Sequence, residues 1–271
     1  PGLKDFCYLV NPFYPGKKLV EEMQASFLSL LTNYPSGMAV NSLVAAKSFG
    51  LKKEQVCVGN GAAELIRLLM ALVKGRLGVT APTFEEYPNR KKEELEVFFP
   101  ENRDFSYNAE DIKNYFAHKD IEGLVLINPD NPSGNFLPPG EVRGLAEWAG
   151  ERGIRLILDE SFSDFADGDM KENSMLHREL LERYPGMIVI KSISKSYGIP
   201  GLRLGIAASG DEALIRKMKS EAAIWNINSF GEFYMQIAEK YAKTYEDAME
   251  RFREARREFT GLLEKIGGLR V

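Results

Sequence analysis

The chain has 271 residues, of which 44% are hydrophobic and 27% are charged. This composition excludes an intrinsically disordered chain, a fibrous repeat and a disulfide-stapled scaffold, and the length suits one large or two modest domains. A formal charge of -4 argues against broad binding to nucleic acid or to anionic membranes.

Signals for export, membrane insertion and metal binding are weak. No apolar run approaches the length of a membrane span, because Arg67 interrupts Leu65–Val73. The chain begins at Pro1 without a basic and then apolar leader, so we expect a cytoplasmic protein. Cys7 and Cys57 lack metal-binding spacing, and the sequence does not determine whether they pair, so we expect no metal site.

Short apolar runs bounded by turn residues alternate with stretches of helical spacing. Strands are predicted at Val56–Val58, Leu77–Thr80, Leu95–Phe99, Gly123–Ile127, Ile154–Leu158, Met187–Ile190 and Leu204–Ala208. Helices are predicted at Ala62–Val73, Phe84–Lys92, Ala109–Phe116, Gly140–Arg152 and Glu172–Arg183. The alternation predicts an α/β fold with a mostly parallel seven-stranded sheet between helices. The last connection is short, so the seventh strand is expected to run antiparallel.

Helical stretches also flank the predicted sheet. One runs from Lys17 to Leu31, and a charge-rich one, with a solvated face, runs from Phe230 to Lys265. We therefore divide the chain into three parts, namely an N-terminal segment of residues 1–33, a part of residues 34–235 that contains the sheet, and a long helical part of residues 236–271.

Small and polar residues follow the predicted strands, at the edge where open α/β sheets bind ligands. The loop from Gly59 to Glu64 leads into a helix whose N–H groups and positive end favour a phosphate. Glu64 replaces the third glycine of a dinucleotide-binding motif, and a plain turn at a helix start is the commoner explanation of such a loop taken alone.

Two further loops carry an amide and a carboxylate. Prolines and a glycine lock the NPDNPSG run, which holds Asn131 either toward a ligand or within a rigid surface turn. Asp159 ends a buried strand, where an ionised carboxylate is costly without strong partners. We therefore expect a positively charged partner for Asp159.

The segment after the sixth predicted strand concentrates hydroxyl and cationic groups. Ser192, Ser194 and Arg203 together suit a dianionic phosphate. Lys195 lies among them, and a lysine held beside other cations loses its proton more readily and becomes a nucleophile.

These motifs resemble those of a known family. The NPxNPxG loop of Asn131, the LDE run of Asp159 and the SxSKxYGxPGLRxG segment of Lys195 are similar to fold type I enzymes that depend on pyridoxal 5'-phosphate (PLP). Within these, the chain most resembles class I/II aminotransferases of the histidinol-phosphate aminotransferase type and the related threonine-phosphate decarboxylases. The resemblance runs in order from Asn11 to Val271.

The resemblance implies a role for each motif residue. Lys195 forms the internal aldimine with the cofactor and then acts as a base at the substrate α-carbon. Asp159 pairs with the pyridine nitrogen and keeps it protonated, Asn131 hydrogen-bonds the phenolic oxygen, and Phe84 stacks on the ring.

The same resemblance assigns a set of residues to the cofactor phosphate. They are Gly61, Ala62, Ala63, Ser192, Ser194 and Arg203. Tyr34, in a Tyr-Pro turn, matches the residue that reaches the phosphate of the neighbouring subunit. A homodimer with shared active sites is therefore implied.

The implied function is an aminotransferase that moves an amino group between an amino acid, or an amino-acid phosphate, and a 2-oxo acid. A decarboxylase similar to threonine-phosphate decarboxylase is an alternative, because the bond that breaks is the one held perpendicular to the ring. A third interpretation is an aminotransferase-like module of a longer fusion protein, with little activity of its own.

Two features depart from the family pattern. Phe162 stands where aminotransferases usually carry a tyrosine that bonds the phenolic oxygen, a change that favours the decarboxylases modestly and is compatible with an active aminotransferase. The resemblance implies that residues 1–33 are an N-terminal arm and part of a small domain, that residues 34–235 are the PLP-binding large domain, and that residues 236–271 lead to a C-terminal small domain that is incomplete here. The substrate-carboxylate arginine that the family carries in this small domain has no match, because Arg270 does not fit its motif. His118 and His177 are interpreted as surface residues away from the strand ends.

Overall fold

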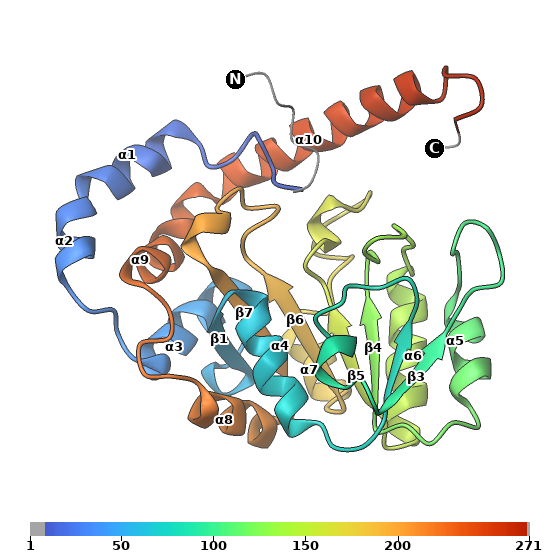
Figure 1. Cartoon of the computed structure of the whole chain (residues 1–271). Helices are drawn as coiled ribbons and strands as arrows, with labels where there is room; N and C mark the ends of the chain where they lie inside the picture. The colour runs from blue at the N-terminus through green and yellow to red at the C-terminus, as the bar shows by residue number, and fades with distance from the viewer. Residues whose placement is uncertain (1–8, 270–271) are drawn as a thin grey trace.

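A computed structural model describes residues 9–269 as a seven-stranded sheet covered by helices on both faces (Figure 1). The strands are β1 (Val56–Asn60), β2 (Leu77–Thr80), β3 (Leu95–Phe98), β4 (Gly123–Ile127), β5 (Arg155–Asp159), β6 (Met187–Ser192) and β7 (Leu204–Ser209). Their order is β1-β7-β6-β5-β4-β2-β3. Only the pairings of β7 with β1 and β6 are antiparallel. The predicted α/β fold, the mostly parallel sheet and the antiparallel seventh strand are confirmed.

Two cores form because the strands are buried on both faces. In β4, Leu124 and Leu126 face one core while Val125 and Ile127 face the other, as the two-residue period of a strand requires. Helices α4 (Gly61–Leu72) and α8 (Glu212–Glu221) cover one face of the sheet. The other face is covered mainly by α5 (Ala109–Phe116), α6 (Pro139–Glu151), α7 (Arg178–Arg183) and α9 (Ser229–Ile237).

Helices from the two ends of the described chain complete the structure. They are α1 (Lys17–Ala25), α2 (Phe27–Thr32), α3 (Met38–Phe49) and α10 (Ala242–Leu263). Figure 1 shows α10 beyond the edge toward which the parallel strands point. The loops that follow the strands therefore lie between the sheet and α10.

The N-terminal segment is tied to the loop of Lys195. The backbone N–H of Asn11 donates to the Lys195 carbonyl oxygen over 2.9 Å. Gly198 has a φ of +61°, and a Cβ there would lie 1.8 Å from the Tyr14 carbonyl oxygen. Only glycine allows this close approach, so the sequence pattern around Lys195 has a packing reason as well as a chemical one.

One predicted helix is wrong. Phe84–Lys92 forms turns and the short 3-10 helix Pro88–Arg90. Pro88 supplies no N–H, and its ring clashes with the preceding turn of an α-helix. The segment consequently remains irregular and places Tyr87 in the core.

A second predicted helix, Glu172–Arg183, begins only at Arg178, as α7. Its first part makes different hydrogen bonds, because the Ser174 hydroxyl and the Met175 N–H donate to the buried Glu160 carboxylate. A helix through these residues would leave that carboxylate without its donors.

Both flanking helices are interrupted. The helix predicted from Lys17 to Leu31 breaks at Ser26 into α1 and α2. The stretch from Phe230 to Lys265 contains a 3-10 turn at Ala238–Tyr241 between α9 and α10. In this turn the Tyr241 hydroxyl donates to Glu22 of α1, so the interruption fastens the two ends of the chain together.

Several sequence-based interpretations concern absences or the chain ends. Within residues 9–269, no helix is long and apolar enough to cross a membrane. In the same part of the chain, no group of three or more His, Cys, Asp or Glu residues could hold a metal ion. His118 and His177 are exposed. Pro1, Cys7 and Arg270 lie outside the described residues, and the division into three parts stays a prediction.

Candidate active site

A cavity of about 1180 Å³ lies at the carboxyl ends of the parallel strands. Its lining includes six of the residues that the sequence predicted for the site, namely Phe84, Asn131, Ser192, Ser194, Lys195 and Arg203. These residues come from four different loops or strand ends. The fold therefore gathers the candidates that are far apart in the sequence.

Lys195 is flanked by aromatic rings in this cavity. Its Nζ lies 3.8 Å from the centroid of the Phe162 ring and 5.9 Å from that of Phe84. Among the residues that the structure describes, none forms a hydrogen bond with this ammonium group. Burial lowers the pKa of Lys195, and the negative charge of Asp159 partly opposes that shift. Burial, and not the neighbouring cations that the sequence suggested, is thus the cause.

Asp159 lies at the end of β5 and is 3% exposed. Its Oδ2 accepts a hydrogen bond of 2.8 Å from the Tyr87 hydroxyl, and its Oδ1 accepts one of 2.9 Å from the Ser161 N–H. In the described part of the chain neutral donors bind this carboxylate, and the positively charged partner expected for Asp159 stays a prediction. Both oxygens are held, so the orientation of the carboxylate is fixed.

Tyr87 is a site residue that sequence reasoning missed. It is fully buried, and burial together with the adjacent Asp159 raises the pKa of its hydroxyl well above the usual value. The hydroxyl therefore stays protonated and donates to Asp159 at every physiological pH. The only signal in the sequence is a Tyr-Pro pair inside a pattern that was read as helical.

An anion cradle forms where β7 passes the first turn of α4. A Cβ on Gly205 would lie 2.6 Å from the Ala62 backbone nitrogen, so only glycine lets the strand and the helix approach this closely. A Cβ on Gly61 would lie 2.5 Å from Nη2 of Arg203, which places the guanidinium beside the helix start. The N–H groups of Gly61, Ala62 and Ala63 belong to this turn.

Hydroxyl groups lie on the other side of the cradle. Ser192 ends β6, and its N–H donates to the Ser161 hydroxyl oxygen over 3.1 Å. Ser194 donates to the Leu204 carbonyl oxygen in a long contact of 3.5 Å, which leaves its hydroxyl available to a stronger acceptor. Arginine, hydroxyl and helix N–H groups in one place suit a phosphate.

Hydrogen bonds between residues of the same loop hold the loop that carries Asn131. The Asn128 side chain donates to and accepts from the backbone of Leu137, over 2.9 Å and 2.8 Å. Asp130 is 5% exposed, and its Oδ1 has no hydrogen-bond partner. Burial raises the pKa of Asp130 to about 6. The sequence predicted the rigid loop but not its buried carboxyl group.

Tyr34 lies outside the cavity. It is 79% exposed and stacks on Trp225, with ring centroids 4.4 Å apart. The structure thus does not bring Tyr34 together with the other predicted residues of its own chain. This position leaves open the predicted reach toward a neighbouring subunit.

A buried ionic network lies next to the Lys195 loop, and no pattern in the sequence predicts it. Asp164 forms an ion pair of 2.8 Å with Lys191 and accepts hydrogen bonds of 2.8 Å from the hydroxyls of Ser196 and Tyr245. Burial raises the pKa of Asp164, but Lys191 and these hydrogen bonds lower it further, so the net shift is downward. The network connects the residue after Lys195 to α10.

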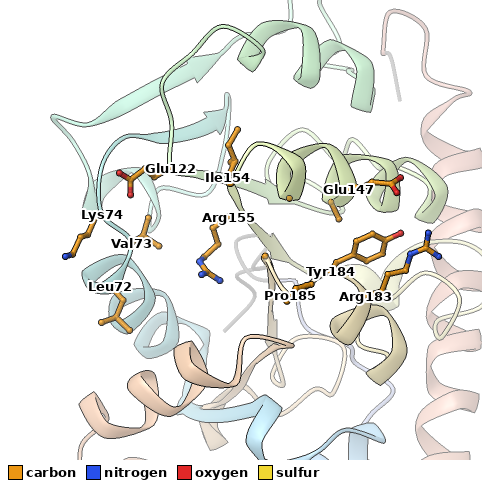
Figure 2. A pocket seen from close by; sticks show the side chains of 14 residues that line it. Leu72, Val73, Lys74, Glu122, Glu147, Ile154, Arg155, Arg183, Tyr184 and Pro185 are labelled. Carbon is orange, nitrogen blue, oxygen red and sulfur yellow. The ribbon is translucent and has the colours of Figure 1, made fainter.

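A different cavity, of about 680 Å³, lies at the opposite end of β5 and holds none of the predicted site residues (Figure 2). Figure 2 shows Lys74, Glu122 and Arg155 around it. Arg155 begins β5 and forms an ion pair of 3.0 Å with Asp211, whereas Asp159 ends the same strand. This cavity is therefore remote from Lys195.

The sheet, the lysine within the cavity and the anion cradle define an α/β enzyme of the fold type I class. The chain belongs to the class I and II aminotransferase family, which its residues 24–271 match. Enzymes of this family use PLP, and a histidinol-phosphate aminotransferase of Sinorhizobium meliloti is among the solved structures in complex with it.

Relatives of the chain differ in the reaction that their names state. It is 32% identical over 266 residues to an L-serine phosphate decarboxylase of Sulfurospirillum multivorans, a match that covers 94% of this chain and 66% of the relative. It is 31% identical over 271 residues to a CMP-5'-(3-aminopropyl)phosphonate synthase of Streptomyces rubellomurinus, covering 100% of this chain. This chain spans only 42% of that relative.

The fold is shared with a solved aminotransferase. The histidinol-phosphate aminotransferase of Clostridium acetobutylicum superposes with a TM-score of 0.84 at 24% identity, over 99% of this chain and 79% of that one. At this identity the similarity shows the fold alone.

The cavity residues fit PLP by their chemistry. The cradle in which Gly61 and Gly205 leave room offers cationic, hydroxyl and N–H donors for a phosphate. Lys195 offers a partly buried amine without a hydrogen-bonding partner in residues 9–269, and Asp159 offers a fixed carboxylate. A phosphate, an aldehyde and a basic ring nitrogen are the groups that such a set can hold.

Proposed function

We propose that the protein is a PLP-dependent enzyme that breaks a bond at the α-carbon of an amino acid bearing a phosphate or phosphonate group, and that the reaction is decarboxylation. The observation that carries this proposal is that one cavity gathers Lys195 with Ser192, Ser194 and Arg203, and that Asp159 is near enough for its charge to act on the Lys195 amine. When bound, PLP supplies an electron sink for the charge that develops at the α-carbon.

The polar and aromatic residues in and around the cavity have the following roles in this proposal. Arg203, Ser192, Ser194 and the N–H groups of the α4 start hold the cofactor phosphate. Asp159 meets the ring nitrogen, and Tyr87 and the Ser161 N–H keep its carboxylate in place. Asn131 meets the phenolic oxygen and Phe84 covers the ring face. Lys195 gives a proton to the α-carbon after the bond to the carboxylate breaks and carbon dioxide leaves.

Two observations favour decarboxylation. The ring centroid of Phe162 lies 3.8 Å from Nζ of Lys195, so no phenol hydroxyl is supplied at the position where the aminotransferases usually carry tyrosine. In addition, the decarboxylase of Sulfurospirillum multivorans is 32% identical over 94% of this chain. That enzyme's name also supports a phosphorylated amino acid as the substrate class.

Transamination is the second candidate. Burial lowers the pKa of Lys195, so more of its amine is unprotonated than in an ordinary lysine and available to take a proton from the α-carbon. Lys195 would then move that proton to the cofactor, and a 2-oxo acid would accept the amino group.

A homodimer is part of the proposal. Large apolar side chains are exposed on α2, on α3 and beside Tyr34, including Leu28, Leu31, Leu43 and Trp225. A second copy of the chain would cover them and would bring Tyr34 toward the neighbouring cofactor phosphate.

Borohydride reduction of the protein loaded with PLP, followed by peptide mapping, tests the cofactor site. We expect a pyridoxyl group on Lys195, no adduct on that peptide in Lys195→Ala, and an unchanged adduct in Lys217→Ala, which alters an exposed lysine on α8. An adduct on a different lysine, or no adduct, contradicts the proposal.

The reaction is tested with O-phospho-L-serine. Release of carbon dioxide without any 2-oxo acid supports decarboxylation. Amino transfer that requires 2-oxo acid, without release of carbon dioxide, would replace decarboxylation by the second candidate.

A further inference from the structure

Arg256 lines the same cavity as Lys195, although it comes from α10 and belongs to none of the predicted motifs. Its Nη1 donates to the Phe165 carbonyl oxygen, and its Nη2 donates to the carboxylate of Asp167. Phe165 and Asp167 belong to the segment that follows Asp159 and Phe162. Arg256 is thus fixed to the wall of the cavity that carries the Phe162 ring.

The Arg256 guanidinium has N–H donors that its two hydrogen bonds do not use. It carries five N–H groups, and the two hydrogen bonds to Phe165 and Asp167 use two of them. The Arg256 side chain is 34% exposed, so the remaining donors are accessible from the cavity. It is therefore oriented and still able to bind a ligand.

The ion pair with Asp167 is weak and exchangeable. The Asp167 side chain is 75% exposed, and a pair with one such partner contributes about 0–1 kcal/mol to stability. A phosphate offers more charge and more acceptor oxygens to a guanidinium than a single carboxylate does. A ligand phosphate in the cavity can therefore displace Asp167.

The cavity has three cationic side chains among the residues described, and two already have a use. In the proposed function Lys195 binds the cofactor and exchanges a proton at the α-carbon, and Arg203 lies beside Gly61 in the cradle for the cofactor phosphate. Arg256 lies on a different wall, next to Phe165. A second anion that enters the cavity would meet Arg256.

We propose that Arg256 binds the terminal phosphate or phosphonate of the substrate and so determines the substrate class. This proposal rests on the proposed function and deepens it. Asp167 holds the guanidinium in position before the substrate arrives and is displaced by the substrate anion. The chain thereby selects amino acids with a second, dianionic group.

Rapid mixing of the PLP-loaded enzyme with amino acids tests the proposal by the absorbance change that precedes turnover. O-phospho-L-serine is compared with L-serine in the unaltered enzyme and in Arg256→Gln, Asp167→Asn and Arg257→Gln. Arg257 is the matched control, because it follows Arg256 on α10, does not line the cavity and pairs with Glu250.

We expect Arg256→Gln to raise the dissociation constant of O-phospho-L-serine about tenfold or more, which corresponds to the loss of a charge-assisted contact. The dissociation constant of L-serine, which has no phosphate, should change less than about twofold. Asp167→Asn should tighten binding of O-phospho-L-serine, since the competing carboxylate is gone. Inorganic phosphate should compete in the unaltered enzyme and not in Arg256→Gln.

Other outcomes overturn the proposal. If Arg256→Gln weakens both amino acids equally, Arg256 does not read the second anion. If Asp167→Asn and Arg256→Gln weaken binding alike, the ion pair is only a structural clamp. Formation of the pyridoxyl adduct on Lys195 is recorded for every variant, so loss of the cofactor site is distinguished from loss of substrate recognition.

Discussion

The Tyr87 hydroxyl donates a hydrogen bond of 2.8 Å to Oδ2 of Asp159, and both side chains are buried. The segment of Tyr87 and the end of β5 are far apart in the chain, so this bond ties the segment that carries Phe84 to the end of β5. A carboxylate held at both oxygens keeps its position without solvent, which suits the role proposed for Asp159 beside the cofactor ring.

Replacement of Tyr87 by phenylalanine removes this donor and keeps the packing. Hydrogen bonds to charged groups contribute about 1.5–3 kcal/mol, so we expect the free energy of unfolding in urea to fall by that amount. The rate of the proposed reaction should fall about tenfold, because a loosened Asp159 stabilises the transition state less.

Tyr115→Phe is the matched control. The Tyr115 hydroxyl donates a hydrogen bond of 2.7 Å to the Val97 carbonyl oxygen, and neither residue lines the cavity. Its stability should fall by about 1 kcal/mol with the activity unchanged. Equal effects of the two variants on activity would contradict the role given to Tyr87.

Gly205→Ala should damage the anion cradle. The added Cβ would lie 2.6 Å from the Ala62 backbone nitrogen, so the first turn of α4 has to move away from β7. We expect the dissociation constant of PLP, measured by its absorbance, to rise about tenfold or more, since an oriented helix terminus contributes about 1 kcal/mol and Arg203 moves with it.

The control for this prediction is Gly150→Ala in α6. A Cβ on Gly150 has no heavy atom within 4 Å, and alanine favours a helix, so stability should rise slightly while PLP affinity stays the same. An unchanged PLP affinity in Gly205→Ala would show that the cradle does not need the close approach of β7.

The contrast between Lys195 and Tyr87 shows what the sequence can and cannot predict. Lys195, Asn131 and Arg203 are recognisable because their loops carry prolines and glycines at fixed spacings, and the strands before them have a continuous apolar pattern. The sheet follows from the same pattern, including the reversed β7, because its connection is too short for a helical crossover.

Tyr87 and Asp164 could not be predicted, because their roles arise from partners distant in the sequence. Asp164 meets Lys191 and Tyr245 only after β6 and α10 have packed against it. The false helix at Phe84–Lys92 has the same origin. Tertiary burial of Tyr87 and the proline beside it outweigh local helical spacing.

The buried Asp130 should make stability depend on pH. Burial raises its pKa from 3.8 to about 6, so the unfolded chain ionises before the folded one as pH rises. Stability contributed by the protonated carboxyl is complete below the lower value and is lost as pH rises through about 6. The loss should be on the order of 2 kcal/mol.

The side chain of Asp130→Asn stays neutral, so this variant should not show the loss of stability as pH rises. Urea unfolding between pH 4 and pH 7 measures it as a declining stability of the unaltered protein relative to the variant, and Asp120→Asn, at an exposed position, should run parallel to the unaltered protein. Parallel curves for Asp130→Asn as well would mean that the carboxyl is not buried in its neutral form.

Removing one partner of the ion pair between Asp164 and Lys191 should lower stability more than removing both charges together. Both side chains are buried, and Asp164→Asn leaves the Lys191 ammonium without a counter-charge, so we expect a loss of about 3–5 kcal/mol in urea unfolding at pH 7.

The double variant with Lys191→Met removes both charges, and it should be more stable than Asp164→Asn alone, which gives a positive coupling in a double-mutant cycle. Asp247→Asn is the control, since its pair with Lys243 is exposed to solvent and should contribute little to stability. Additive losses in the cycle would mean that the two groups are stabilised separately, by hydroxyl donors such as Ser196 and Tyr245, and the ion pair would then not be what holds the Lys195 loop against α10.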